Sequence, residues 1–215
     1  TPEERRSAML WLTRALAERQ RFEEAETLLQ SEIEDTFAPA PRGELTTALA
    51  RVRLAAGRVD EAIAALQTLA PGAPPQPWEA EALRLLAGAL LKANRPDEAL
   101  AVFDTLIERF PGDPQSGEWR LEAAALWEEL GGVEEAIARL DALIEVAGPP
   151  VAHEARLRRA RLDLRLGHAD EAEQRVQPLL NDQAVNPLHQ AEAWLLMAAA
   201  REQRSEWSAA LEALE

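Results

Sequence analysis

The sequence contains no cysteine, and only 5% of its 215 residues are aromatic. The missing cysteine excludes a disulfide scaffold, a zinc–thiolate site and a thiol nucleophile. No run of about 18 uncharged apolar residues is present, which excludes a membrane-spanning helix. The first residues lack the charged-then-apolar pattern of a secretory signal peptide, so we expect none in this stretch. Lysine is almost absent too, because Lys92 is the one lysine among 23 basic residues.

Charge and hydrophobic content narrow the class of protein. Hydrophobic residues make up 47% of the chain, which is enough for a sizeable core and argues against disorder. The 23 basic and 38 acidic residues give a net charge of −15. Such a charge opposes binding to nucleic acids and anionic membranes, so we expect no nucleic-acid partner and no membrane insertion. The preference for arginine suits bidentate carboxylate partners, and it equally fits the coding bias of a GC-rich genome.

An internal repeat organises the chain. The motif Asp/Glu-Glu-Ala recurs five times, and a degenerate Ser-Ala-Ala follows near the end. We call its last alanine the anchor of each repeat; the anchors are Ala25, Ala62, Ala99, Ala136, Ala172 and Ala210. Their spacings are 37, 37, 37, 36 and 38 residues, which is too even to arise by chance.

Positions counted from the anchor predict the fold of one repeat. Five residues before it, where a left-handed turn could close a helix, stand Gln20, Gly57, Asn94, Gly131, Gly167 and Ser205. Twelve before it stand the small residues Thr13, Ala50, Ala87, Ala124, Ala160 and Ala198. Four after it stand Leu29, Leu66, Phe103, Leu140, Val176 and Leu214, and seven after it Leu69, Leu106, Leu143 and Leu179, with Glu32 as the exception. The spacing predicts a helix, a short turn and a second helix in every repeat.

The period runs through the whole chain, so we expect one domain over residues 1–215. Its repeats span about 1–37, 38–77, 78–113, 114–149, 150–187 and 188–215. Thr1-Pro2-Glu3-Glu4 is a good helix start, whereas Leu211–Glu215 breaks off within a helical pattern. We therefore expect this sequence to be a piece of a longer protein.

The combined pattern resembles the tetratricopeptide repeat family over essentially the whole chain, most closely from Phe103 to Pro111. The resemblance implies an all-α, right-handed solenoid of six helix-turn-helix repeats, the last truncated, whose first helices line a concave groove. The period is longer than the usual 34 residues. The aromatic residue expected late in the first helix is replaced, except at Trp127; the residues at this position are Leu16, Arg53, Leu90, Trp127, Asp163 and Arg201.

Basic side chains on the first helices are the main candidates for a binding site. Arg158, Arg161 and Arg165 are spaced i, i+3, i+7, so they share one helix face. They could grip carboxylates of a partner, or they could form a solvated face paired with neighbouring acidic residues. Further candidate residues on the groove side are Arg51, Arg84 and Trp11. The lysine and asparagine pattern of the family's carboxylate clamp is absent, so we do not expect binding of a chaperone tail.

Two other sets of residues allow competing interpretations. Eighteen residues before the anchors lies a glutamate ladder, which could complement the helix N-termini or form an acidic rim for a basic peptide: Glu44, Glu81, Glu118, Glu154 and Glu192. Among the tryptophans, Trp127, Trp194 and Trp207 are predicted to lie in the core, and Trp78 and Trp119 to pin loops onto their repeats. Trp11 is either a ligand anchor or a packing residue for an upstream repeat.

Nothing in the sequence supports catalysis, a cofactor or a metal site. His153, His168 and His189 lie far apart in the repeat frame, and no phosphate loop, dinucleotide turn or nucleophile elbow is present. We therefore expect a protein–protein interaction scaffold whose groove binds a peptide or a partner helix. The alternative is a structural spacer or assembly module of a bacterial envelope or polysaccharide-export complex, and a third hypothesis is an accessory domain of an enzyme. The sequence does not indicate a compartment.

Overall fold

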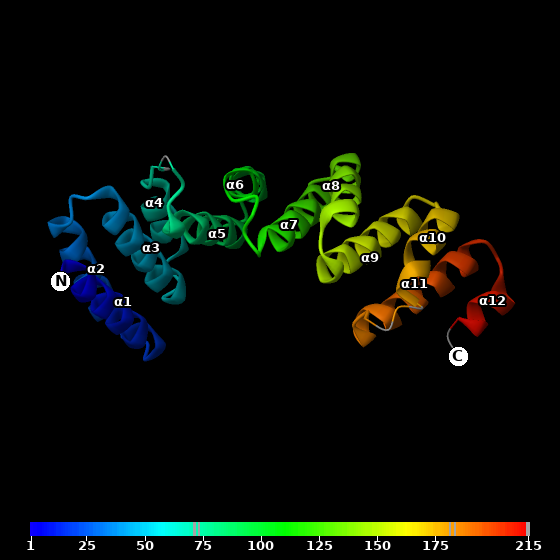
Figure 1. Ribbon diagram of the computed structural model, residues 1–215, viewed down its shortest axis with the longest axis horizontal. Helices are drawn as coiled ribbons and strands as arrows, with labels where there is room; N and C mark the ends of the chain where they lie inside the picture. The colour runs from blue at the N-terminus through cyan, green and yellow to red at the C-terminus, as the bar shows by residue number, and fades with distance from the viewer. Residues whose placement is uncertain (71, 73, 181, 183, 214–215) are drawn as a thin grey trace. The chain divides into compact units, whose positions relative to one another are not determined.

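The computed structural model describes residues 1–70, 72, 74–180, 182 and 184–213. These residues form twelve α-helices and no strand, which confirms the predicted all-α solenoid of helix pairs (Figure 1). The helices are α1 (Pro2–Glu18), α2 (Phe22–Asp35), α3 (Pro39–Ala55), α4 (Val59–Gln67), α5 (Pro77–Lys92), α6 (Pro96–Arg109), α7 (Ser116–Glu129), α8 (Val133–Val146), α9 (Pro149–Arg165), α10 (Ala169–Leu180), α11 (Pro187–Gln203) and α12 (Trp207–Glu212). None of them combines the length and apolar character that a bilayer crossing requires.

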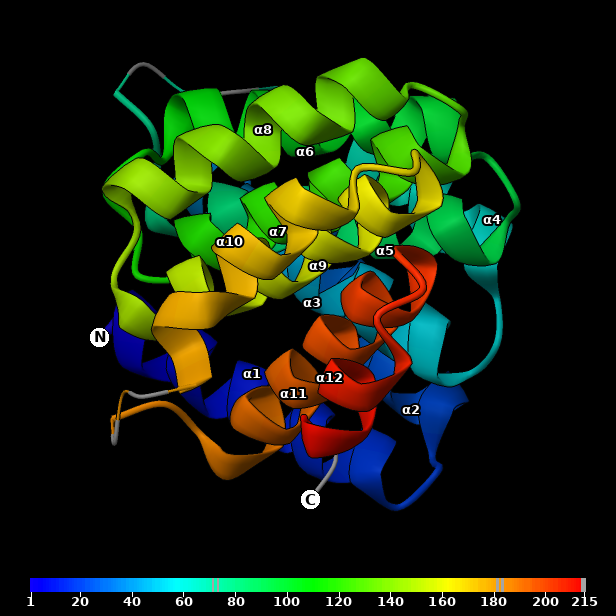
Figure 2. The same cartoon turned by 90° about the vertical axis from the view of Figure 1, so that its right-hand side faces the viewer.

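The chain divides into two compact units, Thr1–Asp113 with α1–α6 and Pro114–Glu215 with α7–α12. In the first unit α2 packs on α3 and α4 on α5, so the second helix of each repeat contacts the first helix of the next. In the second unit α8 packs on α9 and α10 on α11 in the same way. First helices also touch one another, α1 with α3 and α3 with α5, and likewise α7 with α9 and α9 with α11 (Figures 1 and 2).

A left-handed residue closes the turn inside every repeat, as the sequence predicts. The backbone φ angles are 61° at Gln20, 58° at Asn94 and 64° at Ser205, and 78–84° at the three glycines Gly57, Gly131 and Gly167. The amide that follows the left-handed residue donates a hydrogen bond back to the first helix, for example from Arg58 to the carbonyl of Arg53 at 2.8 Å. This pattern is a Schellman motif, and it fixes where each second helix begins.

The periodic small and apolar residues form the core, as predicted. All six anchor alanines are buried, and five of them have no exposed surface at all. The small residues twelve positions earlier are also buried, as are the large apolar residues four positions after the first five anchors. Leu214, the sixth member of that last row, lies outside the described residues. Close helix contact at alanine, combined with leucine packing, accounts for the regular stacking of helix pairs.

In two repeats, arginine replaces the aromatic residue that the family has late in the first helix, and ion pairs explain the replacement. Arg53 donates from Nε to Glu26 Oε1 of the preceding repeat at 2.9 Å, and Arg201 donates to Glu173 Oε1 at 3.0 Å. Each arginine also donates to a backbone carbonyl near the start of its own second helix. The same position thus joins three helices through an Arg–Glu pair where the family uses an apolar side chain.

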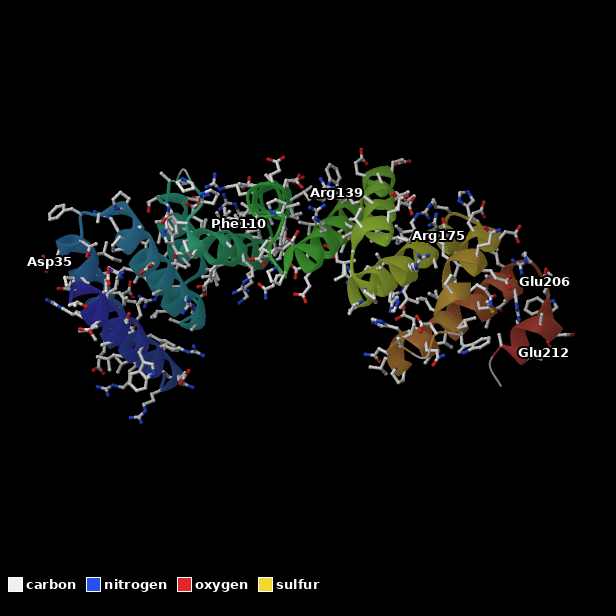
Figure 3. All side chains as sticks on the ribbon, in the orientation of Figure 1. Asp35, Phe110, Arg139, Arg175, Glu206 and Glu212 are labelled. Carbon is white, nitrogen blue, oxygen red and sulfur yellow. The ribbon has the colours of Figure 1, made fainter. Side chains whose placement is uncertain are left out.

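The fifth repeat carries a buried carboxylate at that position. Asp163 is fully buried and accepts hydrogen bonds from Arg159 and from Arg175 Nε, the latter at 2.7 Å. Arg175 extends from α10, where Figure 3 labels it, and also bonds Asp141 of α8 at 3.0 Å. Arg159 is itself buried. This network joins α8, α9 and α10 through charged groups inside the second unit.

The tryptophans correct part of the sequence-based interpretation. Trp194 and Trp207 are 38% and 60% exposed, so the prediction that they lie in the core is wrong: no helix in the described part of the chain covers these positions of α11 and α12. Trp119 is buried, whereas Trp127 is half-buried and stacks under the Arg139 guanidinium. Trp78 packs so closely on α3 that a Cβ added to Gly43 would lie 2.3 Å from its ring.

Candidate partner-binding surface

The candidate residues lie on one side of the first helices. We call this side the first-helix face and define it by the rows fourteen and eleven residues before each anchor: Trp11, Arg14, Ala48, Arg51, Leu85 and Gly88 in the first unit, and Glu122, Ala125, Arg158, Arg161, Leu196 and Ala199 in the second. Arg84 and Arg165 lie one helical turn from Gly88 and Arg161, so they belong to the same face. Trp11 is 73% exposed on α1.

The three arginines of α9 share a face, as predicted, and each has a glutamate partner. Arg158 donates to Glu154 at 2.6 Å and to the backbone carbonyl of Leu121 on α7 at 3.1 Å. These two bonds hold its side chain against α7. Arg158 therefore has a structural role in joining two first helices.

The other two arginines of α9 are more accessible. Arg161 pairs with Glu192 of α11, and Arg165 pairs with Glu128 of α7. Their side chains are 47% and 60% exposed, and a guanidinium has five donors, so each keeps N–H groups for a further acceptor. Exposed pairs of this kind contribute only about 0–1 kcal/mol each, so a partner carboxylate could replace the glutamate at little cost.

The glutamate ladder takes part in these pairs. Glu44 accepts from Arg6 at 2.8 Å, Glu81 pairs with Arg51, and Glu192 pairs with Arg161. In the last two pairs an arginine eleven residues before one anchor meets the glutamate eighteen residues before the next. The same two rows also place Arg14 opposite Glu44, but Arg14 pairs with Glu18 instead, so the rows alone do not determine the pairs. The ladder is therefore partly neutralised.

A hollow between α1 and α3 is a feature of the candidate surface that the sequence did not reveal. It encloses about 280 Å³ within the first unit. Apolar side chains form much of its wall, including Leu10, Ala48 and Val52, and Arg14 and Arg51 stand beside them. Arg14 pairs with Glu18 on its own helix at 3.3 Å. The hollow thus combines an apolar wall with two exposed guanidinium groups.

A second apolar surface lies on α11 and α12. Leu195, Trp207 and Leu211 are each at least 60% exposed, and they border a hollow of about 430 Å³. The residue equivalent to Leu195 in the fifth repeat is Leu157, which is fully buried. The exposure at α11 and α12 is therefore a property of this position in the array and not of the residue type.

The three histidines lie on different elements: His153 on α9, His189 on α11 and His168 in the turn before α10. His189 Nε2 lies 3.5 Å from Glu154 Oε2 of α9. Burial lowers the pKa of His153, and the charges of His189 and Arg156 lower it further, against an opposing effect of Asp182. Among the described residues no three histidine or carboxylate side chains are grouped as a metal would require.

Comparison with known proteins agrees with this repeat architecture. The tetratricopeptide repeat profile matches residues 47–114 and 121–176, which is more than half of the chain. A search of curated protein sequences found no match to the chain.

Three solved structures show the same fold at low sequence identity. A tetratricopeptide repeat protein from Parabacteroides merdae ATCC 43184 has 16% identity and a TM-score of 0.65, over 97% of this chain and 77% of that one. The TPR-like repeats of a kinesin light chain from Podosopora anserina have 17% identity and a TM-score of 0.63, over 94% and 97%. The apo form of the quorum sensor NprR from B. thuringiensis has 14% identity and a TM-score of 0.61, over 97% and 62%. Repeats of this kind generally mediate protein–protein interactions. The chain belongs to the tetratricopeptide repeat family.

Proposed function

We propose that the chain is a protein–protein interaction scaffold that binds a peptide segment or a helix of a partner along its first-helix faces. The observation that carries this proposal is the hollow between α1 and α3. It places an apolar wall beside Arg14 and Arg51 on an accessible side of the first unit. An apolar side chain of the partner would fill the hollow while the guanidinium groups bind a carboxylate or a backbone carbonyl.

The arginines on this face are available for such a partner. Arg51 and Glu81 are both close to half exposed, so water screens their ion pair. Replacing Glu81 with an acceptor from the partner therefore costs little free energy. Arg84 is exposed on α5, and no hydrogen bond or ion pair to it is seen among the described residues. In the second unit, Arg161 and Arg165 offer the same chemistry on α9. We rank Arg158 below these residues because its bonds to α7 hold it in place.

Net charge narrows the chemistry of the partner. At −15 the protein as a whole attracts basic segments and slows the approach of acidic ones. Local binding at the arginines nevertheless requires an acceptor. The segment that best fits both conditions has an apolar anchor residue and a carboxylate or C-terminus next to it, within an otherwise basic stretch.

The test compares variants that differ in the face they alter. A partner is first captured with the wild-type chain from an extract, identified, and reduced to its binding segment. Calorimetry then measures the affinity of that segment for Arg51→Glu and for Arg161→Glu/Arg165→Glu. Arg21→Glu/Arg95→Glu is the control for the double variant, because both arginines form exposed ion pairs at the starts of second helices and the change in charge is equal.

We expect at least one first-helix variant to weaken binding by about tenfold or more, as the loss of a charge-assisted contact implies. The control is expected to stay within about twofold of wild type. Equal effects in all variants would mean that long-range charge alone governs binding. An effect confined to Arg21→Glu/Arg95→Glu would place the partner on the second helices and overturn the proposal.

A role as an assembly module is the second candidate, and the surface of α11 and α12 favours it. Leu195, Trp207 and Leu211 would then contact another protein through α11 and α12 instead of through the first-helix face. Leu195→Glu/Leu211→Glu distinguishes the two functions. Loss of partner binding in this variant, with normal binding by the first-helix variants, would support the assembly role.

A further inference from the structure

Successive repeats within a unit meet through two different faces. We call one the leading face; it lies on the first helix, at the positions seventeen, thirteen and ten residues before the anchor. Where another repeat of the same unit precedes, all of these positions are buried. The residues are Leu45, Leu49 and Val52 on α3, Ala82, Leu86 and Ala89 on α5, Ala155, Arg159 and Leu162 on α9, and Ala193, Met197 and Ala200 on α11.

The trailing face of the preceding repeat covers the leading face. We define it by the position fifteen residues before the anchor, on the first helix, and the position one residue after it, on the second. Leu10 packs in one apolar cluster with the leading face of α3. Leu121 and Ile137 pack with leading-face residues of α9, and Leu157 with those of α11. Leading and trailing faces therefore form the contact between successive repeats.

Two such faces are open in the described part of the chain. The leading face of α1 consists of Ala8, Leu12 and Ala15; Ala8 is exposed, and Leu12 is 44% exposed. The trailing face of α11 and α12 consists of Leu195 and Leu211, which are 60% and 65% exposed and border the hollow of about 430 Å³. One open face is thus of the leading kind and the other of the trailing kind, and these two kinds cover each other within both units.

A further pair of positions shows that the two open faces match. Between successive repeats, the residue one after an anchor bonds the residue nine before the next anchor; two such pairs are Glu26 with Arg53 and Glu173 with Arg201. The repeats that carry the open faces have Leu211 and Leu16 at these positions. A lone glutamate or arginine there would be buried against an apolar side chain, which is costly. Two leucines avoid this cost, so the open faces are compatible with each other.

We propose that the open face on α11 and α12 binds α1 of a second copy of this chain. Leu12 then lies in the hollow beside Leu195 and Leu211, as Met197 lies in one cluster with Leu157 inside the second unit. The contact names the partner for the assembly role proposed above, and it rests on that role. None of its residues belongs to the first-helix face, which stays free for a peptide.

The contact is heterologous, because the two copies contribute different faces. Each copy keeps a face for a further copy, so association continues beyond the dimer unless the copies close into a ring. Both copies carry a net charge of −15, so they repel each other at low salt. Screening removes this repulsion and leaves the apolar contact in place. We therefore expect the association to become stronger as the salt concentration rises.

Sedimentation equilibrium of the purified chain measures this association. Wild type is compared at about 1–500 µM protein and at about 0.05 and 0.5 M NaCl. Leu12→Glu alters the leading face of α1, and Leu211→Glu alters the trailing face of α12. Leu166→Glu is the matched control, because Leu166 is 46% exposed and caps the end of α9, outside both open faces. Circular dichroism first verifies that all variants are as helical as wild type.

We expect the weight-average mass of wild type and of Leu166→Glu to rise with concentration to about twice the monomer mass or more. Leu12→Glu and Leu211→Glu should each weaken the association about tenfold or more, because a glutamate then enters an apolar contact. A wild type that stays monomeric at the higher salt concentration would overturn the proposal. Equal weakening by Leu166→Glu would do so too.

Mixing the two variants gives the most specific result. Leu12→Glu keeps its trailing face and Leu211→Glu keeps its leading face, so an equimolar mixture is expected to form one heterodimer and nothing larger. Association that Leu211→Glu abolishes and Leu12→Glu leaves intact would indicate a symmetric dimer through α11 and α12, and would contradict the proposal. Loss of a captured partner in Leu195→Glu/Leu211→Glu, together with a monomeric wild type, would keep the assembly role and refute this inference.

Discussion

Asp163 provides the sharpest test of how the second unit is held together. It is fully buried, and it accepts hydrogen bonds from Arg159 and from Arg175. Asp163→Ala leaves the buried Arg159 with Asp141 as its carboxylate partner, a half-exposed side chain whose Oδ1 lies 3.3 Å from Nε. Removing one member of a buried ion pair typically costs about 3–5 kcal/mol, and we expect a loss in this range.

Thermal and urea unfolding followed by circular dichroism would measure the effect. For a chain of this length, about 1 kcal/mol corresponds to a shift of roughly 2–4 °C in Tm. Asp141→Ala is the matched control: its side chain is 40% exposed, so we expect a cost of about 1 kcal/mol or less. Asp163→Leu/Arg159→Leu should recover most of the stability, because it removes the unpaired charge together with its partner. A loss in Asp163→Ala no larger than in Asp141→Ala would refute the reasoning.

Three further predictions concern backbone, packing and pH. Gly131→Ala should lower the stability by about 1 kcal/mol in a melting experiment, because φ is 84° there, whereas Ser205→Gly, at a φ of 64°, should leave it unchanged or raise it. Gly43→Ala should cost about 1–3 kcal/mol, since its Cβ would overlap the Trp78 ring, and an unchanged Tm would contradict this packing. Burial would raise the pKa of Glu79, but backbone N–H groups and Arg109 outweigh burial and lower it. The resulting stabilisation is present above the unfolded pKa of about 4.3 and is lost as pH falls through the lower folded value. The Tm of Glu79→Gln should therefore fall less than that of wild type in this acidic range, and parallel curves would contradict the pKa shift.

The spacing of the repeats predicted the fold well, because helix and turn formation within each repeat depends on residues close together in the sequence. Counting five residues back from each anchor alanine identified Gln20 and Ser205 as left-handed turn residues, although glutamine and serine rarely adopt this conformation. The register carried this information because the same turn recurs in every repeat. Identity alone would have suggested glycine or asparagine.

Features that depend on neighbouring elements were not predictable in the same way. Trp194 and Trp207 occupy packing positions, but burial requires a further helix over them, and the described chain provides none. The early end of α4 at Gln67 was equally hidden, because the leucine spacing continues past it to Leu69 without a break. A periodic pattern describes the average repeat, so it does not reveal the individual repeat that departs from it.

The arrangement of the candidate arginines was predictable only in part. Their common face follows from i, i+3, i+7 spacing, and Arg158 also pairs with Glu154 on its own helix. The contacts to other helices, however, join residues 31–37 positions apart in the sequence. Arg158 has a backbone partner on α7 that no sequence pattern indicates. The distinction between Arg158 as a structural residue and Arg161 as an accessible one therefore came from the structure.

Photo-crosslinking tests the central claim, that a partner binds along the first-helix face. A benzophenone-bearing residue replaces Ala55, which lines the hollow between α1 and α3, and in a second protein replaces Ala64, which is exposed on the second helix α4. The account predicts that Ala55 crosslinks to the captured partner and that Ala64 does not. Crosslinks from Ala64 alone would contradict it.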